Sequence, residues 1–102
     1  MSDAESVDEV VEIVREDAAR RYVVTVDGVQ AGVAVFVASP SAVTFTHTVV
    51  DPAFGGRGIG GRLAKFALDD TVARGLRIVP RCPFIAAYLR EHPGYEASVD
   101  WP

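Results

Sequence analysis

Five of the nine glycines in this chain of 102 residues lie within seven consecutive positions, from residue 55 to residue 61. β-Branched residues dominate the sequence before this cluster and helical periodicity follows it, so the cluster connects a strand to a helix. One or two glycines satisfy a strand-to-helix turn. The excess therefore favours a loop whose backbone approaches a ligand over the alternative, a merely flexible turn. Because the first N–H groups of a helix have no partner within it, the expected ligand is a phosphate. The candidate binding residues here are Gly55, Gly56, Arg57, Gly58, Ile59, Gly60 and Gly61.

The first half of the chain predicts an antiparallel β meander. Asp27-Gly28 is a strong hairpin signal, and the segment from Arg15 to Arg20 is expected to be a turn. Val10–Val14 by itself is compatible with a strand or a short helix. The remaining strands are expected at Arg21–Val26, Val29–Ala38 and Val43–Val50. Strict alternation in the last of these places Phe45, His47 and Val49 on one face, and Thr44, Thr46, Thr48 and Val50 on the other.

The second half predicts a β-α-β-α arrangement. A helix is expected from Ile59 to Arg74, with Gly75 as its C-terminal glycine and Leu76–Val79 as a short strand. Pro83 opens a second helix, which ends before Pro93-Gly94. The apolar residues expected on the core faces of the two helices are Ile59, Leu63, Phe66, Ala67 and Ala73, then Phe84, Ile85, Tyr88 and Leu89. The fold class is therefore α+β with a mixed sheet, and a parallel crossover joins Val43–Val50 to Leu76–Val79.

Two familiar phosphate loops do not fit the glycine cluster. A P-loop requires Lys-Ser or Lys-Thr after its last glycine, whereas Gly60 is followed by Gly61-Arg62. Gly56, Gly58 and Gly61 do match G-x-G-x-x-G, the dinucleotide fingerprint. However, the acidic residue expected roughly 20 positions later is missing, since the next strand leads into Pro80-Arg81. A dinucleotide-binding fragment is therefore disfavoured.

The segment HTVVDPAFGGRGIGG (residues 47–61) resembles the GNAT superfamily of acyl-CoA N-acetyltransferases, in which Q/R-x-x-G-x-G/A starts the helix that holds the CoA pyrophosphate. Gly58 and Gly60 match the two small positions, whereas Gly55 stands where the superfamily has Gln or Arg, and Arg57 is a substitute source of charge. IVPRCPFIAAYLREHPGYEASV (residues 78–99) is similar to the small, cysteine-containing, single-domain branch. VEIVREDAARRYVVTVDGVQAGVAVFVAS (residues 11–39) follows its opening hairpins, which favours a strand at Val10–Val14.

The resemblance implies a GNAT-like fold with a splayed parallel strand pair, and acetyl-CoA as co-substrate. The backbone of Val49 and Val50 would bind the pantetheine arm and help to polarise the thioester carbonyl. Tyr88 matches the superfamily's general acid, with a core aromatic role as the alternative. Cys82 matches a cysteine considered as an acyl acceptor, and a helix N-terminus favours the thiolate; a small buried side chain is the alternative. His47 is a candidate base for Cys82, against a structural role.

Charge and composition limit the kind of ligand and the cellular location that are expected. Residues 55–92 contain seven basic and three acidic side chains, whereas the whole chain has a net charge of −4. This favours a small anionic ligand over nucleic acid. No apolar run is long enough for a membrane span, the N-terminus is acidic, and there is one cysteine, so a cytoplasmic protein is expected. Two histidines and one cysteine without ligand spacing argue against a metal site.

The sequence predicts one domain over residues 1–102, with residues 1–9 as a loose tail. Two main hypotheses for its function remain. The first is an N-acetyltransferase that moves an acetyl group from acetyl-CoA to an amine of a small molecule or a protein, directly or through Cys82. The second is a CoA-binding sensor or partner-dependent module with little turnover. The short chain leaves almost no room for the helices that build an acceptor site in larger GNAT enzymes. A protein partner or a homodimer would then complete that site.

Overall fold

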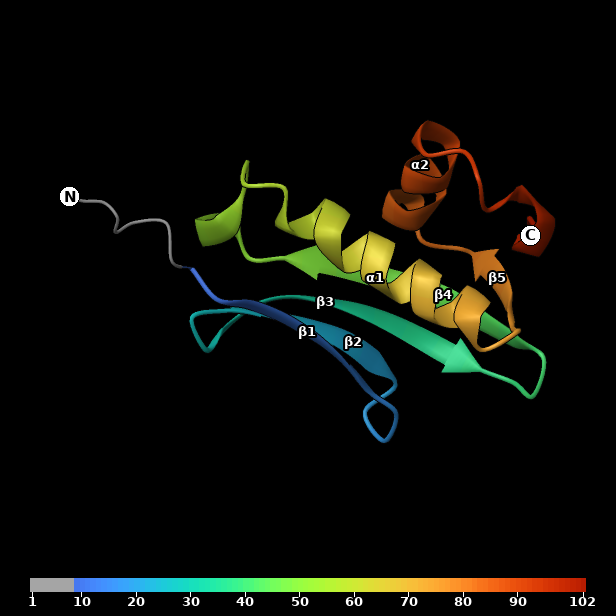
Figure 1. Cartoon of the computed structure of the whole chain (residues 1–102), viewed down its shortest axis with the longest axis horizontal. Helices are drawn as coiled ribbons and strands as arrows, with labels where there is room; N and C mark the ends of the chain where they lie inside the picture. Colours follow the sequence, from blue (N-terminus) through green and yellow to red (C-terminus); the bar gives the residue numbers. More distant parts are fainter. Residues whose placement is uncertain (1–8) are drawn as a thin grey trace.

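Five strands form one sheet in the order β1-β2-β3-β4-β5 in the computed structural model, which describes residues 9–102 (Figure 1). The four strands β1 to β4 pair antiparallel, and β4 pairs parallel with β5. The predicted α+β class with a mixed sheet is therefore confirmed. The strands are β1 (Val11–Glu16), β2 (Arg21–Val26), β3 (Val29–Ala38), β4 (Ala42–Val50) and β5 (Arg77–Pro80).

The start of the sheet differs in detail from the sequence-based prediction. The first segment is a strand, as the resemblance favoured, but it continues through Arg15 to Glu16. These two residues pair with Tyr22 and Arg21, so the turn is confined to residues 17–20. Arg15 forms an ion pair with Asp70, and Glu16 forms one with Arg21 on the neighbouring strand.

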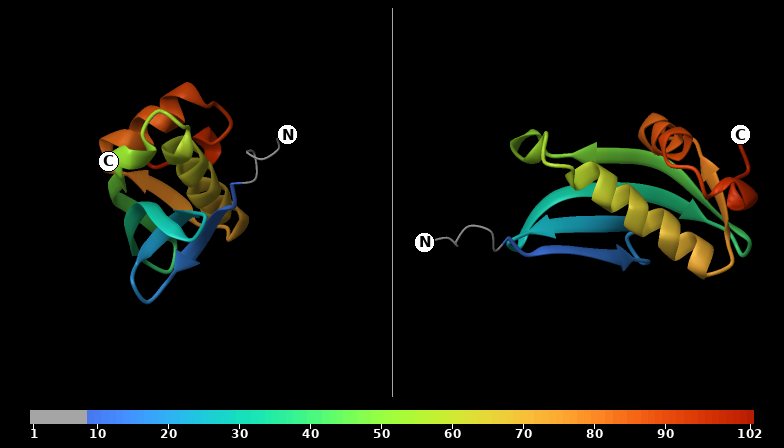
Figure 2. Two further views of the ribbon diagram at one scale, coloured as in Figure 1. Left: turned by 90° about the vertical axis from the view of Figure 1, so that its left-hand side faces the viewer. Right: turned by 45° about the horizontal axis from the view of Figure 1, so that its top comes forward.

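Two helices, α1 (Ile59–Ala73) and α2 (Pro83–Glu91), lie on the same side of the sheet (Figures 1 and 2). Gly75 follows α1 with a φ of 73°, and Pro83 occupies the first turn of α2, as predicted. Two short 3-10 turns at Pro52–Phe54 and Glu96–Ser98 were not predicted. Neither α1 nor α2, within the described part of the chain, is long and apolar enough to cross a membrane.

One core fills the space between the helices and the sheet, and it corrects part of each predicted helix face. Phe66 is 39% exposed and Ala73 is also exposed, whereas Ala64, Leu68 and Thr71 are buried. On α2, Ile85 and Leu89 are buried in this core, but Phe84 is 39% exposed and Tyr88 is half-buried. Because successive helical residues are 100° apart, positions 84 and 88 lie beside positions 85 and 89 and turn toward a cleft.

A β-bulge changes the face of β4. Val35 pairs with His47 and Phe36 pairs with Phe45, so Thr46 is an extra residue in the ladder. The predicted strict alternation is therefore wrong beyond Thr46. Before the bulge Phe45 points into the core, and after it Thr48 and Val50 point toward the helices, while His47 and Val49 are exposed on the other side.

The parallel pair separates at the same level. The β4–β5 ladder runs from the pair Ala42–Arg77 to the pair Phe45–Pro80, and one further bond joins Arg81 N–H to the carbonyl of Phe45. Proline ends the ladder and the chain then turns into α2. The part of β4 that follows the bulge has no β5 partner, which is the splayed pair that the resemblance implied.

A polar cluster at the end of α1 ties this helix to the edge of the sheet. Asp70 accepts hydrogen bonds from Arg15 Nη1 at 2.5 Å, from the Tyr22 hydroxyl at 2.7 Å and from Arg74 Nη1 at 3.4 Å. Burial raises the pKa of the Asp70 carboxyl, but the hydrogen bonds from Tyr22 and Arg15 outweigh it and hold the pKa below its ordinary value. The ionised carboxylate therefore stabilises the fold.

The N-terminal end of α1 approaches both β4 and α2 closely at Gly60. A Cβ at this position would lie 2.8 Å from Phe84 Cζ and 3.2 Å from Val50 Cγ2. Its neighbour Gly61 has no heavy atom within 4 Å of the corresponding position. Gly60 thus lets the Phe84 ring and the Val50 side chain approach α1 closely, whereas Gly61 has no such neighbour.

We expect Asp70→Asn to lower the free energy of unfolding by about 1–3 kcal/mol at neutral pH, because an ionic hydrogen-bond acceptor is lost. The wild-type advantage should be constant above the ordinary aspartate pKa of about 3.9 and should disappear as the pH falls through the lowered pKa of Asp70. Urea unfolding of both proteins at several pH values measures this. A gap that persisted unchanged at low pH would contradict the ionic role.

We expect Gly60→Ala to be less favourable than Gly61→Ala by about 1 kcal/mol, because the new methyl group must displace the Phe84 ring and press on Val50 Cγ2. Gly61→Ala is the matched control and should be neutral or stabilising, since alanine favours a helix and meets no neighbour. Replacing Phe84 by Ala should cancel most of the extra cost of Gly60→Ala in a double-mutant cycle of unfolding free energies. Equal effects of the two glycine substitutions would refute this packing.

Candidate functional site

The glycine loop places an uncapped helix N-terminus at the open end of β4. Gly56 and Gly58 have φ values of 75° and 74°, a left-handed conformation that disfavours other residues. Gly58 is the N-cap of α1 and has no side chain to cap the helix, so first-turn N–H groups stay available. Donors of this kind, at the positive end of the helix dipole, suit a phosphate.

Arg57 supplies the positive charge of this loop, and it has two contacts. Its guanidinium pairs with Glu9 and lies 5.3 Å from the centre of the Phe54 ring. The expected loose tail over residues 1–9 falls almost entirely outside the described residues, but Glu9 is described and reaches the loop. Gly55 has an extended backbone with a φ of −63°, so the usual Gln or Arg of this position would meet no left-handed strain.

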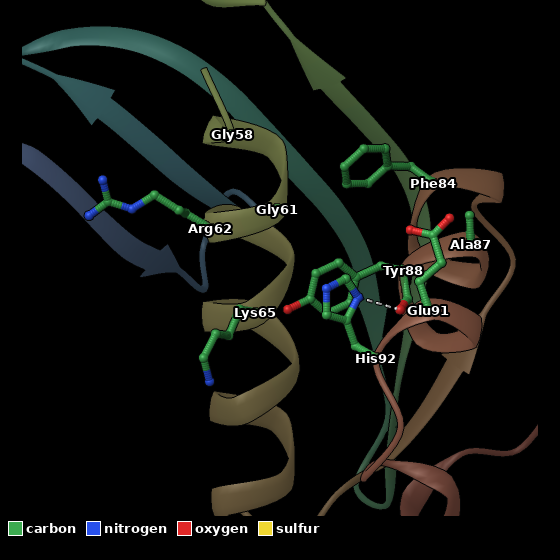
Figure 3. Close-up of a pocket in the computed structure, with 9 residues that line it drawn as sticks. All are labelled: Gly58, Gly61, Arg62, Lys65, Phe84, Ala87, Tyr88, Glu91 and His92. Carbon is green, nitrogen blue, oxygen red and sulfur yellow. Dashed lines mark hydrogen bonds between the residues drawn. The ribbon is translucent and has the colours of Figure 1, made fainter. Parts of the chain in front are cut away.

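Two adjacent clefts open beside the loop. The smaller, of about 290 Å³, lies between the loop, the end of β4 and α2. The larger, of about 660 Å³, lies between α1 and α2 (Figure 3). Gly58, Gly61 and Phe84 line both, so the clefts meet at the Phe84 ring. The other residues of the larger cleft are Arg62, Lys65, Ala87, Tyr88, Glu91 and His92.

Tyr88 reaches from α2 across the larger cleft toward α1, on the side where Lys65 lies (Figure 3). The His92 ring stacks on Tyr88 at a centroid distance of 3.8 Å and an angle of 14°, and His92 Nδ1 is 2.9 Å from the Tyr88 carbonyl oxygen. Burial raises the pKa of the Tyr88 hydroxyl. It is therefore a protonated donor at neutral pH. His92, the exposed C-cap residue of α2, was not among the candidate site residues.

Cys82 occupies the N-cap position of α2, as predicted, and it is 3% exposed. Its thiol donates to the Thr48 hydroxyl, with 3.3 Å between Sγ and Oγ1. Thr48 follows the bulge of β4, so Cys82 lies against the part of β4 that β5 does not cover. Thr48 was not among the candidate site residues, because the bulge that directs it toward Cys82 has no signal in the residue pattern.

His47 and Cys82 are not brought together. His47 is exposed and its Nδ1 lies 3.2 Å from Thr46 Oγ1. The next residue, Thr48, points to Cys82, and successive side chains on a strand point to opposite faces. The two candidate catalytic residues are therefore on opposite faces of the sheet, which leaves His47 without the predicted pairing.

The polar backbone groups of Val49 and Val50 point to opposite edges of β4. The N–H of Asp51 donates to the carbonyl of Ala31 at 2.8 Å, so the polar backbone groups of Asp51 face β3. Because these groups alternate along an antiparallel strand, those of Val49 also face β3, and those of Val50 and Thr48 face the open side. The Val49 side chain is 59% exposed on the far face of the sheet.

Other chemistry is sparse at this site. Within residues 9–102, no three His, Cys, Asp or Glu side chains are grouped so that they could hold a metal ion. The loop and clefts offer backbone donors, aromatic rings and a buried thiol, together with the basic side chains of Arg57, Arg62 and Lys65. This set suits a phosphate-bearing ligand with an extended arm.

The sequence of this chain is similar to that of known proteins. The GCN5-related N-acetyl-transferase family matches residues 21–99, which include all strands but the first, both helices and the loop. Similar relatives are the proteins NATD1 of Xenopus tropicalis, Gallus gallus and Homo sapiens, each 43% identical over 51 residues. The aligned part is 50% of this chain and 47%, 46% and 45% of the respective relatives. The chain thus matches about half the length of these relatives. Since the family covers most of the described sheet and both helices, this chain belongs to the GCN5-related N-acetyltransferases.

Proposed function

We propose that this protein transfers an acetyl group from acetyl-CoA to an amine of a small molecule or a protein. Family membership supports acyl transfer in general. The observation that carries the finer proposal is the position of the uncapped, glycine-started α1 directly beside the unpaired part of β4. A phosphate held at the helix and an arm laid along the strand describe the two halves of CoA.

The CoA pyrophosphate would bind at the start of α1. Backbone N–H groups of Gly58, Ile59, Gly60 and Gly61 are the donors nearest to the loop, and the left-handed Gly56 and Gly58 keep Cβ atoms away from it. Arg57 would exchange its exposed pairing with Glu9 for the pyrophosphate. Exposed ion pairs contribute little, about 0–1 kcal/mol, so this exchange is easy.

The pantetheine arm would lie in the smaller cleft, between β4 and α2. The open-side backbone groups of Val50 and Thr48 are available to hydrogen-bond its amides, whereas the polar backbone groups of Val49, which the resemblance had also assigned to the arm, face β3. A backbone N–H directed at the thioester oxygen would stabilise the negative charge that develops there. The arm would thus reach the level of Thr48 and Cys82.

Transfer requires a C–N bond to form and the C–S bond to break, with a proton delivered to the leaving thiolate. Tyr88 is the proposed acid, because its hydroxyl extends into the cleft and its raised pKa keeps it protonated. In the direct route the amine attacks the thioester. In the alternative route Cys82 Sγ takes the acetyl group, CoA leaves as the thiol, and the amine then attacks the new thioester.

The proposal also covers the domain organisation, the cellular location and the partners of the protein. We assign the activity to one domain, in the cytoplasm, with acyl-CoA and an amine acceptor as its partners and without nucleic acid. The positive excess of residues 55–92 supports an anionic small ligand. CoA binding without turnover would instead indicate the sensor or partner-dependent module.

We expect Gly58→Glu to reduce acetyl-CoA affinity by about tenfold or more, which is ~1.4 kcal/mol, because a side chain and a negative charge enter the phosphate loop. Titration calorimetry measures this. Gly75→Glu is the matched control: Gly75 has nearly the same φ, at 73°, also faces open space, and lies at the far end of α1. Equal losses in both variants, or none in Gly58→Glu, would refute the proposed loop.

Intact-protein mass spectrometry after incubation with acetyl-CoA separates the two routes. The route through Cys82 predicts an adduct of roughly 42 Da, one acetyl group, that maps to Cys82 and disappears when an amine is added. Cys82→Ala should lack the adduct and the turnover. Acetylation of the amine by Cys82→Ala at the wild-type rate would exclude this route and leave direct transfer.

A further inference from the structure

The hydroxyl of Tyr88 differs from those of the other two tyrosines in the chain. The Tyr22 hydroxyl donates to Asp70 at 2.7 Å. The Tyr95 hydroxyl donates to Asp69 at 2.6 Å. No acceptor of this kind in the described part of the chain holds the Tyr88 hydroxyl, which extends from α2 across the larger cleft toward α1 (Figure 3). The direction of this phenol must therefore be fixed by contacts along its ring.

The imidazole of His92 covers one face of the Tyr88 ring. The two ring centroids are 3.8 Å apart and the ring planes differ by 14°, so the rings lie face to face (Figure 3). Residues four apart on a helix share one side of it, which brings these two side chains together. Phe84, four residues before Tyr88, lines the same cleft. The phenol thus extends from a stripe of three rings on α2, and His92 is the ring stacked against it.

His92 is itself held in place by the end of α2. Its Nδ1 lies 2.9 Å from the carbonyl oxygen of Tyr88, and a carbonyl oxygen only accepts, so Nδ1 carries a hydrogen whether or not the second ring nitrogen does. This carbonyl is one of the last four of the helix, which lack partners within it. Pro93 follows and disfavours a helical backbone at His92, which has a φ of −129°. The helix therefore ends at the residue whose ring covers Tyr88.

We propose that His92 is a positioning residue, whose stacked ring holds the Tyr88 phenol in the direction of α1 and the cleft. This inference deepens the proposed function and rests on it for the role of Tyr88 as the acid that protonates the leaving thiolate. An acid acts from within hydrogen-bond distance of the atom that it protonates, so a phenol that turned freely would spend less time at the sulfur. A stacked ring restrains the phenol and leaves its hydroxyl free, whereas a carboxylate partner would occupy it.

Titration of the Tyr88 hydroxyl tests the stack directly. Burial raises the pKa of this hydroxyl, and Lys65 and Asp69 of α1 act on it in opposite directions. His92→Ala uncovers one face of the phenol and should lower this pKa toward the ordinary value of about 10. His92→Phe keeps a flat ring in place and should preserve the raised pKa. NMR of the full chain with ¹³C at tyrosine Cζ follows the titration, and Tyr88→Phe assigns the signal among the three tyrosines.

Arg90→Ala is the matched control for the end of α2. Arg90 also belongs to the last turn of the helix, but its guanidinium lies 5.0 Å from the centre of the Trp101 ring and does not line the cleft. This variant should leave the Tyr88 titration and the turnover unchanged. A general loosening of the helix end would instead affect Arg90→Ala and His92→Ala alike.

Turnover of acetyl-CoA, with spermidine and Nα-acetyl-lysine amide as probe amines, measures the consequence for catalysis. His92→Ala should lower kcat by about three- to tenfold, the range expected for loss of a stacked aromatic pair, with little change in KM for acetyl-CoA. His92→Phe should restore most of kcat. In a Tyr88→Phe background, His92→Ala should have no further effect, because the ring that it positions no longer carries an acid.

Two results would overturn the positioning role. One is a Tyr88 titration that His92→Ala leaves unchanged. The other is a kcat for His92→Phe as low as that of His92→Ala, which would indicate that the imidazole nitrogens transfer a proton. Absence of turnover in the wild type, or full kcat in Tyr88→Phe, would count against the proposed function instead, and the titration would still decide whether His92 holds the phenol.

Discussion

The arrangement of this protein depends on the level at which β4 loses its parallel partner. The ladder to β5 stops at Phe45 and Pro80, and the extra residue Thr46 shifts β4 at the same point. If the ladder continued, β5 would cover the backbone of Thr48 and Val50, and α2 could not begin where it does. Polar backbone groups inside a protein normally find partners, so a strand left open beside a cleft is suited to a ligand that supplies them.

The helices complete this opening from two sides. Gly60 lets α1 approach Val50 and Phe84 closely, and the proline at the start of α2 places Cys82 against Thr48. The far end of α1 is held at the opposite edge of the sheet by Asp70 and its partners on β1 and β2. The helix is thus fixed at both ends, and its uncapped N-terminus is directed at the open strand.

The sequence predicted most of this fold because its signals are local. Asp27-Gly28, the glycine cluster, Gly75 and Pro83 each determine a turn or a helix boundary, and the structure places all of them as predicted. The bulge at Thr46 was not predictable in this way, since it results from register across two strands and not from residue type. That single residue explains why the predicted face of His47 was wrong and why Thr48 was missed. The binding loop was predictable from composition, whereas contacts between distant segments, such as Cys82 with Thr48, depend on the tertiary fold.

One strand connects the two surfaces of the molecule. About one hundred residues bury a single core, and here both helices are used on one face of the sheet. After the bulge, Thr48 and Val50 point to the cleft side, while His47 and Val49 point to the face opposite the helices. Without the extra residue these assignments would be exchanged, and polar His47 would enter the core side. The bulge therefore places a hydroxyl next to the thiol of Cys82 and, at the same time, keeps the imidazole of His47 on the exposed side of the strand on which the proposed chemistry takes place.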